Sequence, residues 1–104
     1  MSTERSTELV TRAQRHAALS DVSRLAIVDA LELSDLSPGE VGAMLGLPSN
    51  LVAHHVRVLR DAGIVTQVRS QGDARRTYLQ LVPDTVDGLV DDLVRDGLLV
   101  RGAR

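Results

Sequence analysis

Two short helical segments joined by one tight turn constrain this fold more than any other feature of the sequence. Residues 37–40 read Ser-Pro-Gly-Glu, a capping box with proline at the first helical position, which is a strong signal for a helix start. This helix is predicted to run to about Leu45, where the glycine of the turn "LGLPS" ends it. Ser49 or Asn50 then begins the next helix, which Gly63 terminates.

The remaining segments predict a mainly α-helical domain with a small β-hairpin. After Gly63 the helical spacing of apolar residues gives way to two short strand-like runs, which flank the loop "SQGDARR". The predicted order is α-α-α-α-β-β-α. The expected elements are helices over about 5–18, 21–32, 37–45, 49–62 and 84–97 and strands over 64–69 and 77–82.

The length and composition suit a single domain of 104 residues with an aliphatic core. Tyr78 is the only aromatic residue, so leucine, valine, alanine and isoleucine must fill that core. The absence of cysteine excludes disulfides, thiolate nucleophiles and cysteine-based metal sites. No segment reaches the ~20 apolar residues of a membrane span, and the polar N-terminus lacks the apolar stretch of a signal peptide. We therefore expect a soluble, cytoplasmic protein without a membrane partner.

Charge is distributed unevenly along the chain, although the net charge is only −2. Residues 54–78 carry five arginines against two aspartates, a local charge of +3. Residues 79–96 carry five aspartates against one arginine, a local charge of −4. A basic segment of this kind favours contact with nucleic acid, whose phosphate backbone is negative.

Helical phase separates the two adjacent histidines of the fourth predicted helix. At about 100° per residue, His55 falls in the middle of the apolar side and His54 at the edge of the polar side, so the two rings are expected to point apart. One helix binds a metal ion through residues three or four apart, which these are not. We expect His55 to be a core histidine that bonds a backbone carbonyl or a buried polar group, and His54 to be solvated or to contact nucleic acid. The predicted apolar side consists of Leu51, Val52, His55, Val58, Leu59 and Ala62.

The polar side of the same helix carries side chains that suit the DNA major groove. Asn50 can pair bidentately with adenine and Arg57 with guanine, in a groove wide enough to admit a helix. An ordinary solvated helix face is the alternative. Two features favour DNA: a short capped helix precedes this one across a tight turn, and a basic hairpin with Arg75 and Arg76 at its tip follows it. Together they predict a winged helix-turn-helix domain.

The candidate DNA-contacting residues fall into two groups, and the expected partner is a double-stranded DNA operator. No nucleophile with a positioned base and no phosphate-binding glycine loop occurs, so we expect neither an enzyme nor any catalytic residue. The recognition-helix group is Ser49, Asn50, Ala53, His54, Arg57 and Arg60. The wing group is Arg69, Gln71, Arg75 and Arg76.

Over about 60 residues the sequence resembles the ArsR/SmtB class of winged-helix repressors. The matching segments are "SDVSRLAIVDAL" (20–31), "LSPGEVGAMLGLPSNLVAHHVRVLRDAGIV" (36–65) and "VRSQGDARRTYLQL" (68–81). "LPSNLVAHHVRVL" also resembles the regulator half of proteins that fuse such a domain to an arsenate-reductase-like phosphatase. The resemblance implies a homodimer on an imperfect inverted repeat in a promoter. It also implies repression that is released by an effector, commonly a toxic metal or metalloid ion.

Apolar stripes at both ends of the chain agree with a homodimer assembled through the first and last helices (about 5–18 and 84–97), as the resemblance implies. The stripe on the last helix is wider than a single exposed helix should show. Packing of this helix on its own domain is the alternative. The candidate interface residues are Leu9, Val10, Ala13, Ala17, Val86, Leu89, Val90, Leu93 and Val94.

The chain departs from the metal sites of the class that it resembles. Arsenic and antimony sensors of this class use thiolates, but the corresponding third-helix segment here is "LELSDLSPGE", without cysteine. The other site of the class takes Asp and His ligands from paired last helices, and no histidine follows His55 in this chain. We therefore expect no metal, no cofactor and an effector that is not thiolate-bound. The weak metal candidates are His16, Asp84, Asp87 and Asp91, and a solvated acidic face near a helix N-terminus explains the aspartates more simply.

A winged-helix module that binds protein instead of DNA is the competing hypothesis. The overall acidity of the chain favours this module, as does Ala53, a small side chain in the middle of the presumed reading face. The arginine-bearing hairpin favours DNA. The salt dependence of binding to duplex DNA separates the two, because each phosphate that a protein neutralises releases counterions.

Overall fold

A computed structural model of the protein describes residues 3–73 and 75–95, with the surroundings of side chains described as far as residue 89. The elements follow the order α-α-α-α-β-β-α, as predicted. The predicted end of the last helix near Gly97 lies outside the described residues. The helices are α1 (Thr3–Ala18), α2 (Val22–Leu33), α3 (Pro38–Leu45), α4 (Ser49–Asp61) and α5 (Pro83–Arg95), and the strands are β1 (Val65–Arg69) and β2 (Thr77–Leu81).

Local capping groups fix the ends of α2 and α3. The Asp21 carboxylate accepts the Arg24 backbone N–H at 3.1 Å and caps α2. At α3, Ser37 and Glu40 each accept the other's backbone N–H through their side chains, which completes the predicted capping box. Gly46 ends α3 with a φ of 65°, in the left-handed region that glycine adopts without a steric penalty.

The start of α4 differs from the prediction. Pro48, and not Ser49 or Asn50, is the N-cap residue, and no side chain caps the helix there. The pyrrolidine ring of Pro48 holds its own φ at −68° and so sets the extended entry into the helix without a side-chain hydrogen bond. Ser49 and Asn50 become first-turn residues with exposed side chains. At the other end Gly63, with a φ of 74°, follows the C-cap residue Ala62, as predicted.

The antiparallel hairpin of β1 and β2 is joined by a third segment that the sequence did not predict. Within the hairpin Val65 lies opposite Leu81. On the other edge of β2, Leu79 bridges Leu36, which lies between α2 and α3, and the Leu79 N–H donates to the Leu36 carbonyl at 2.7 Å. Because this bridge attaches the hairpin to the segment before α3, the hairpin has a defined position relative to α3 and α4.

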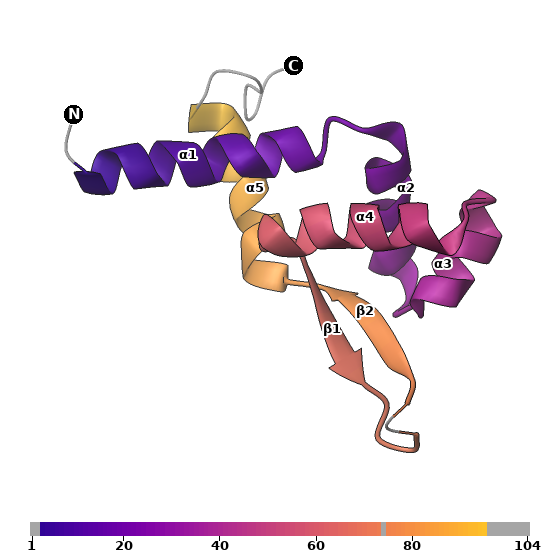
Figure 1. Cartoon of the computed structure of the whole chain (residues 1–104). Helices are drawn as coiled ribbons and strands as arrows, with labels where there is room; N and C mark the ends of the chain where they lie inside the picture. Colours follow the sequence, from indigo (N-terminus) through magenta and orange to yellow (C-terminus); the bar gives the residue numbers. More distant parts are fainter. Residues whose placement is uncertain (1–2, 74, 96–104) are drawn as a thin grey trace.

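The hairpin and α1 lie on opposite sides of α4 (Figure 1). α3 lies beside the N-terminal end of α4, and the hairpin projects from its C-terminal end, so that α3, α4 and β1 border a common space. In the same view α1 extends away from the body of the domain. The fold therefore separates one side, formed by α3, α4 and the hairpin, from another that carries α1.

An aliphatic core joins α2, α4 and the hairpin. Ile27, Leu59, Ile64 and Leu79 come from four different segments and are each 0% exposed. This agrees with a chain whose single aromatic residue cannot form the core. No helix within residues 3–73 and 75–95 has both the length and the apolar character needed to cross a membrane.

The burial of two residues of α4 differs from the predicted apolar side of this helix. Leu51 was placed on that side but is 41% exposed, whereas Val56, which was not, is only 5% exposed. The buried side is rotated toward Val56 because Val56 faces α3 and β1, which together cover it. Val52, Leu59 and the half-buried Val58 keep their predicted contact with the core.

Leu59→Ala is expected to lower the free energy of unfolding by about 2–5 kcal/mol, because it removes a fully buried side chain and leaves a cavity. Leu51→Ala, the same change on the exposed side of the same helix, is expected to cost less than about 1 kcal/mol. Urea unfolding of both variants at one protein concentration measures the difference. Equal losses would contradict this orientation of α4.

Candidate nucleic-acid interface

The six predicted recognition-helix residues all have exposed side chains. Val52, Val56 and Leu59 hold α4 against the core, so the opposite side of the helix faces outward. Asn50 and Arg57 lie one above the other on that side, because seven residues are close to two helical turns. The exposed residues are Ser49, Asn50, Ala53, His54, Arg57 and Arg60.

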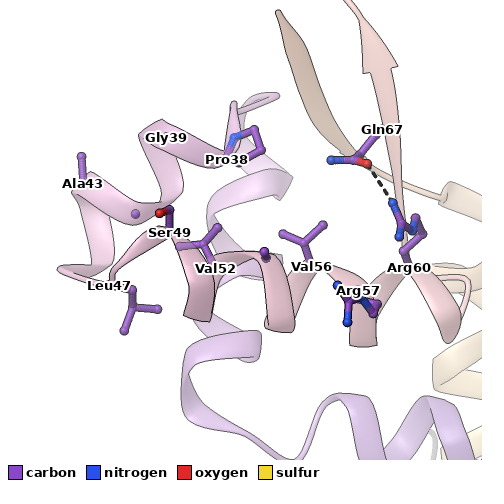
Figure 2. A pocket seen from close by; sticks show the side chains of 12 residues that line it. Pro38, Gly39, Ala43, Leu47, Ser49, Val52, Val56, Arg57, Arg60 and Gln67 are labelled. Carbon is purple, nitrogen blue, oxygen red and sulfur yellow. Dashed lines mark hydrogen bonds between the residues drawn. The ribbon is translucent and has the colours of Figure 1, made fainter.

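A hollow of about 510 Å³ lies between α3, α4 and β1. Figure 2 shows Val52 and Val56 pointing from α4 into this space, with Pro38 of α3 and Gln67 of β1 across from them. The hollow therefore has an apolar floor on α4 between two polar ends. The recognition-helix residues that line it are Ser49, Ala53, Arg57 and Arg60.

Arg60 is oriented by a residue of β1 that sequence reasoning missed. The Arg60 Nη1 donates to Gln67 Oε1 at 2.9 Å, the dashed bond in Figure 2. Gln67 lies within the predicted strand 64–69 and is not among the predicted site residues, although its side chain is exposed. The hydrogen bond between Arg60 and Gln67 depends on how β1 packs beside α4, and the local sequence does not predict this packing. Gln67 therefore joins the candidate interface.

The predicted wing is a tight loop with exposed arginines. The Asp73 carboxylate accepts the Arg75 backbone N–H at 3.0 Å, and the Asp73 carbonyl accepts the Arg76 backbone N–H at 3.0 Å. The one acidic side chain of the loop thus bonds the backbone of the turn. The predicted wing residues Arg69, Gln71, Arg75 and Arg76 are all exposed.

The wing acts electrostatically on the first turn of α3. Hydrogen bonds from the Ser37 backbone and then from its side chain hold the pKa of the Glu40 carboxyl below its ordinary value, and the positive charge of Arg76 lowers it further. Pro38 and Gly39, in the same turn, line the hollow. The start of α3, the hollow and the wing therefore belong to one side of the molecule.

The prediction that the rings of His54 and His55 point apart is wrong. Their centroids lie 5.5 Å from each other at an interplanar angle of 56°. Helical phase fixes the direction of Cβ, but rotation about two further bonds sets the direction of each ring. The surroundings agree with the prediction, since His54 is exposed and the His55 side chain is only 12% exposed.

His55 belongs to a polar cluster that joins three helices. Arg24 Nη1 lies 3.2 Å from His55 Nδ1, and because a guanidinium only donates, Nδ1 accepts this hydrogen bond. The predicted polar partner of His55 is therefore the side chain of Arg24. Arg24 Nε also donates to the Ala18 carbonyl at the end of α1, at 2.7 Å. One guanidinium thus connects α1, α2 and α4.

The Asp21 carboxylate adds a negative charge to the same cluster. Its Oδ2 lies 3.9 Å from His55 Nδ1. The hydrogen bond from the Arg24 N–H holds the pKa of the Asp21 carboxyl below its ordinary value against the opposing effect of desolvation, and the charge of Arg24 lowers it as well. The ionised form of Asp21 is therefore the form that the folded structure favours.

The weak metal candidates do not come together in the part of the chain that the structure describes. Within residues 3–73 and 75–95, no three His, Asp or Glu side chains form a group that could hold a metal ion. His16 is half-buried on α1, whereas Asp84 and Asp87 are exposed at the start of α5. The side chain of Asp91 lies outside the described part.

The predicted interface stripe on α1 is largely exposed in the single chain. Val10 is 56% exposed, and Leu9 beside it is half-buried. Ala13 and Ala17 continue the stripe and are exposed. An apolar surface of this kind is available to a second molecule.

The predicted interface stripe on α5 is partly covered by its own chain. Leu89 is 7% exposed and belongs to the core, and Val86 is half-buried. Leu89 therefore needs no second copy for its burial, and a dimer hypothesis rests on α1 more than on this residue. The side chains of Val90, Leu93 and Val94 lie outside the described residues.

Known proteins resemble both the sequence and the fold of this chain. A family model described as "Helix-turn-helix domain" matches residues 19–68. The uncharacterized HTH-type transcriptional regulator YceK of Bacillus subtilis (strain 168) is 41% identical over 76 residues, which span 71% of this chain and 73% of that protein.

Solved structures share the complete arrangement of elements. An ArsR-like transcriptional regulator from Rhodococcus sp. RHA1 has a TM-score of 0.76 at 24% identity, over 88% of this chain and 83% of its own. The homodimeric winged helix-turn-helix DNA-binding domain of a possible ArsR-family regulator from Mycobacterium bovis has a TM-score of 0.75 at 20% identity, over 100% of this chain and 96% of its own. These likenesses identify the fold as a winged helix-turn-helix.

Asp21→Asn is expected to reduce the loss of stability on acidification. The lowered pKa of Asp21 stabilises the folded state above the unfolded-chain pKa of about 3.9, and this contribution disappears as the pH falls through the folded-state pKa. Asparagine keeps the N-cap acceptor but cannot titrate. The melting temperature should therefore fall less between about pH 6 and about pH 3 in the variant than in the wild type.

The matched control is Asp29→Asn, which removes a charge from the exposed side of α2 away from the cap. This control should keep the acid dependence of the wild type. An Asp21→Asn variant that loses as much melting temperature as the wild type would overturn the role assigned to the Asp21 carboxylate.

Proposed function

Because this chain belongs to the HTH-type transcriptional regulators, we propose that it is a DNA-binding, ArsR-type homodimeric repressor of an inverted-repeat operator. One observation carries the proposal. Four of the six recognition-helix residues line the hollow between α3, α4 and β1. Figure 1 shows that the hairpin lies on one side of α4 and that α1 lies on the other. One side can therefore meet DNA while the other meets a second copy.

α4 is assigned to the major groove, with Arg57 as the principal base-reading residue. The exposed guanidinium of Arg57 can donate two hydrogen bonds to guanine, and the exposed amide of Asn50 can pair with adenine. Arg60 is assigned a phosphate contact, because its bond to Gln67 directs it toward β1.

We assign to the wing a contact with the phosphate backbone of DNA or with the adjacent minor groove. Arg75 and Arg76 are exposed at the turn of the hairpin, where the Asp73 side chain bonds the backbone. Contacts of this kind add affinity for any sequence, whereas contacts from α4 distinguish one sequence from another.

We assign the dimer interface, where a second copy of the chain would bind, to α1. The exposed stripe at Val10, Ala13 and Ala17 supports this assignment, as does the homodimeric state of the similar M. bovis domain. A chain of 104 residues buries only about two-thirds of the surface that its unfolded form exposes, so it gains stability by pairing. Because the chain contains no cysteine, the effector that releases repression is not held by thiolates of this chain.

The competing function is protein binding by a winged-helix module. The salt dependence of the affinity for duplex DNA distinguishes this function from DNA binding. A dimer with about six phosphate contacts should show a log–log slope of affinity against salt near −5. Arg75→Ala together with Arg76→Ala should weaken binding to specific and nonspecific duplex alike and flatten this slope. Fluorescence anisotropy of labelled duplex DNA over a series of potassium chloride concentrations measures this slope. An affinity for duplex DNA that stays constant with salt, or is absent at low salt, would favour the protein partner.

Arg57→Ala is expected to weaken operator binding by about 1–3 kcal/mol per site and to relax base preference at one position. The measurement compares selected operators and single-base variants by equilibrium binding. Glu32→Ala removes a charge from an exposed position of α2, outside both proposed contact surfaces, and should leave base preference unchanged. Wild-type preference in the Arg57 variant would refute its base-reading role.

Val10→Asp is expected to give monomers and to weaken operator binding, because it places a charge in the proposed α1 interface. Val22→Asp is the matched control, since Val22 is 84% exposed at the start of α2. Sedimentation velocity measures the assembly state of both. A dimeric Val10 variant would place the interface elsewhere.

A further inference from the structure

Ala53 is the one residue of the six in the recognition-helix group whose side chain can neither donate nor accept a hydrogen bond. Its side chain is exposed and lines the hollow between α3, α4 and β1. The other five members carry a hydroxyl, an amide, an imidazole or a guanidinium. Assignments based on hydrogen bonding therefore leave Ala53 without a function, although it lies between Asn50 and Arg57 along the helix.

Ala53 is the exposed apolar residue on the α4 side of the hollow. Val52 and Val56 also point toward the hollow (Figure 2), but they are only 1% and 5% exposed and lie beneath Ala53 in the core. On the α3 side the lining residues are small, with Gly42 and Ala43 facing the same space. A Cβ at Gly42 would lie 3.1 Å from the Leu47 carbonyl oxygen and 3.4 Å from Val52 Cγ2, so α3 packs closely against the turn and α4 there. The Ala53 methyl group is therefore the apolar group of α4 that a ligand in the hollow can reach.

The rim of the same hollow is positively charged. Arg57 and Arg60 both line it, and the bond between Arg60 and Gln67 directs the Arg60 side chain toward β1. An exposed apolar side chain beside two arginines fits a ligand that is negatively charged overall and presents one apolar group. The edge of a base pair in the major groove has this character, because the only apolar group that any base presents there is the 5-methyl of thymine.

We propose that Ala53 contacts the 5-methyl group of a thymine in each operator half-site. This inference rests on the proposed function and deepens it, since it names one base that the operator must contain. Ala53 is then a residue that determines specificity and not a neutral gap between Asn50 and Arg57. Cytosine has no methyl group at this place and uracil differs from thymine only by lacking it, so both should bind less well.

The expected effect follows from the size of the group. Burial of one methyl-sized group corresponds to about a fourfold change in affinity per half-site, the equivalent of about 0.8 kcal/mol. This change is small compared with the loss of a bidentate arginine contact, and a position-by-position measurement resolves it.

The test begins with selection of a preferred operator from random duplex DNA by the full-length protein. Each thymine of that operator is then replaced singly by deoxyuridine, which deletes the methyl group and leaves the hydrogen-bonding edge unchanged. Equilibrium binding of the wild type should weaken about fourfold at one thymine per half-site. An operator in which no thymine responds in this way overturns the inference, and this step needs no change to the protein.

Ala53→Gly then tests whether Ala53 makes the contact. The variant should bind the thymine operator about fourfold more weakly per half-site than the wild type and should no longer distinguish it from the deoxyuridine operator. Ala30→Gly, which removes a methyl group from α2 at a similar cost in helix propensity, should keep the wild-type discrimination. Discrimination that persists in the Ala53 variant assigns the thymine to another residue and overturns the inference.

The outcomes separate this inference from the function on which it rests. Selection of a defined operator with no response to deoxyuridine keeps the DNA-binding function and removes the thymine contact. Failure to select any sequence, together with binding that does not change with salt, removes both and favours a protein side chain as the occupant of the hollow.

Discussion

The packing of Val52, Val56 and Leu59 into the aliphatic core fixes the rotation of α4, and the proposed activity depends on that rotation. A helix that buries one side must expose the other, so the polar side chains between Asn50 and Arg60 face outward without any additional support. The left-handed Gly46 before α4 and Gly63 after it let the chain turn sharply at both ends. Helix α4, which lies between these two turns, therefore presents its polar side in one defined direction.

The two sides of α4 are separate in space but connected through the structure. The hollow and the wing lie on one side, and the exposed stripe of α1 lies on the other. Arg24 links them, because its guanidinium bonds both the Ala18 carbonyl of α1 and the ring of His55 on α4. The adjacent histidines thus have a structural explanation: His55 holds α4 to α1 and α2, and His54 stays exposed.

Local chemistry made most of the fold predictable from the sequence. The capping box at Ser37 and the glycines that end helices act within a few residues, so they indicated the element order and most boundaries. Contacts between distant segments were not predictable in this way. Two such contacts are the bridge between Leu36 and Leu79 and the hydrogen bond from Arg60 to Gln67. Both depend on how the hairpin packs against the helices, and the spacing of apolar residues along the sequence does not predict that packing. The exposure of the recognition-helix residues followed from helical phase, whereas ring orientation at the histidines depended on rotatable bonds.

The most direct test of the central claim is a titration of the isotope-labelled protein with its selected operator duplex, followed by amide chemical shifts in solution. The account predicts that the largest changes occur along α4 and in the wing loop, at residues 49–60 and 69–76, whereas the exposed stripe of α1 changes little. Shifts concentrated on α1, with α4 and the wing unaffected at saturating DNA, would contradict the account.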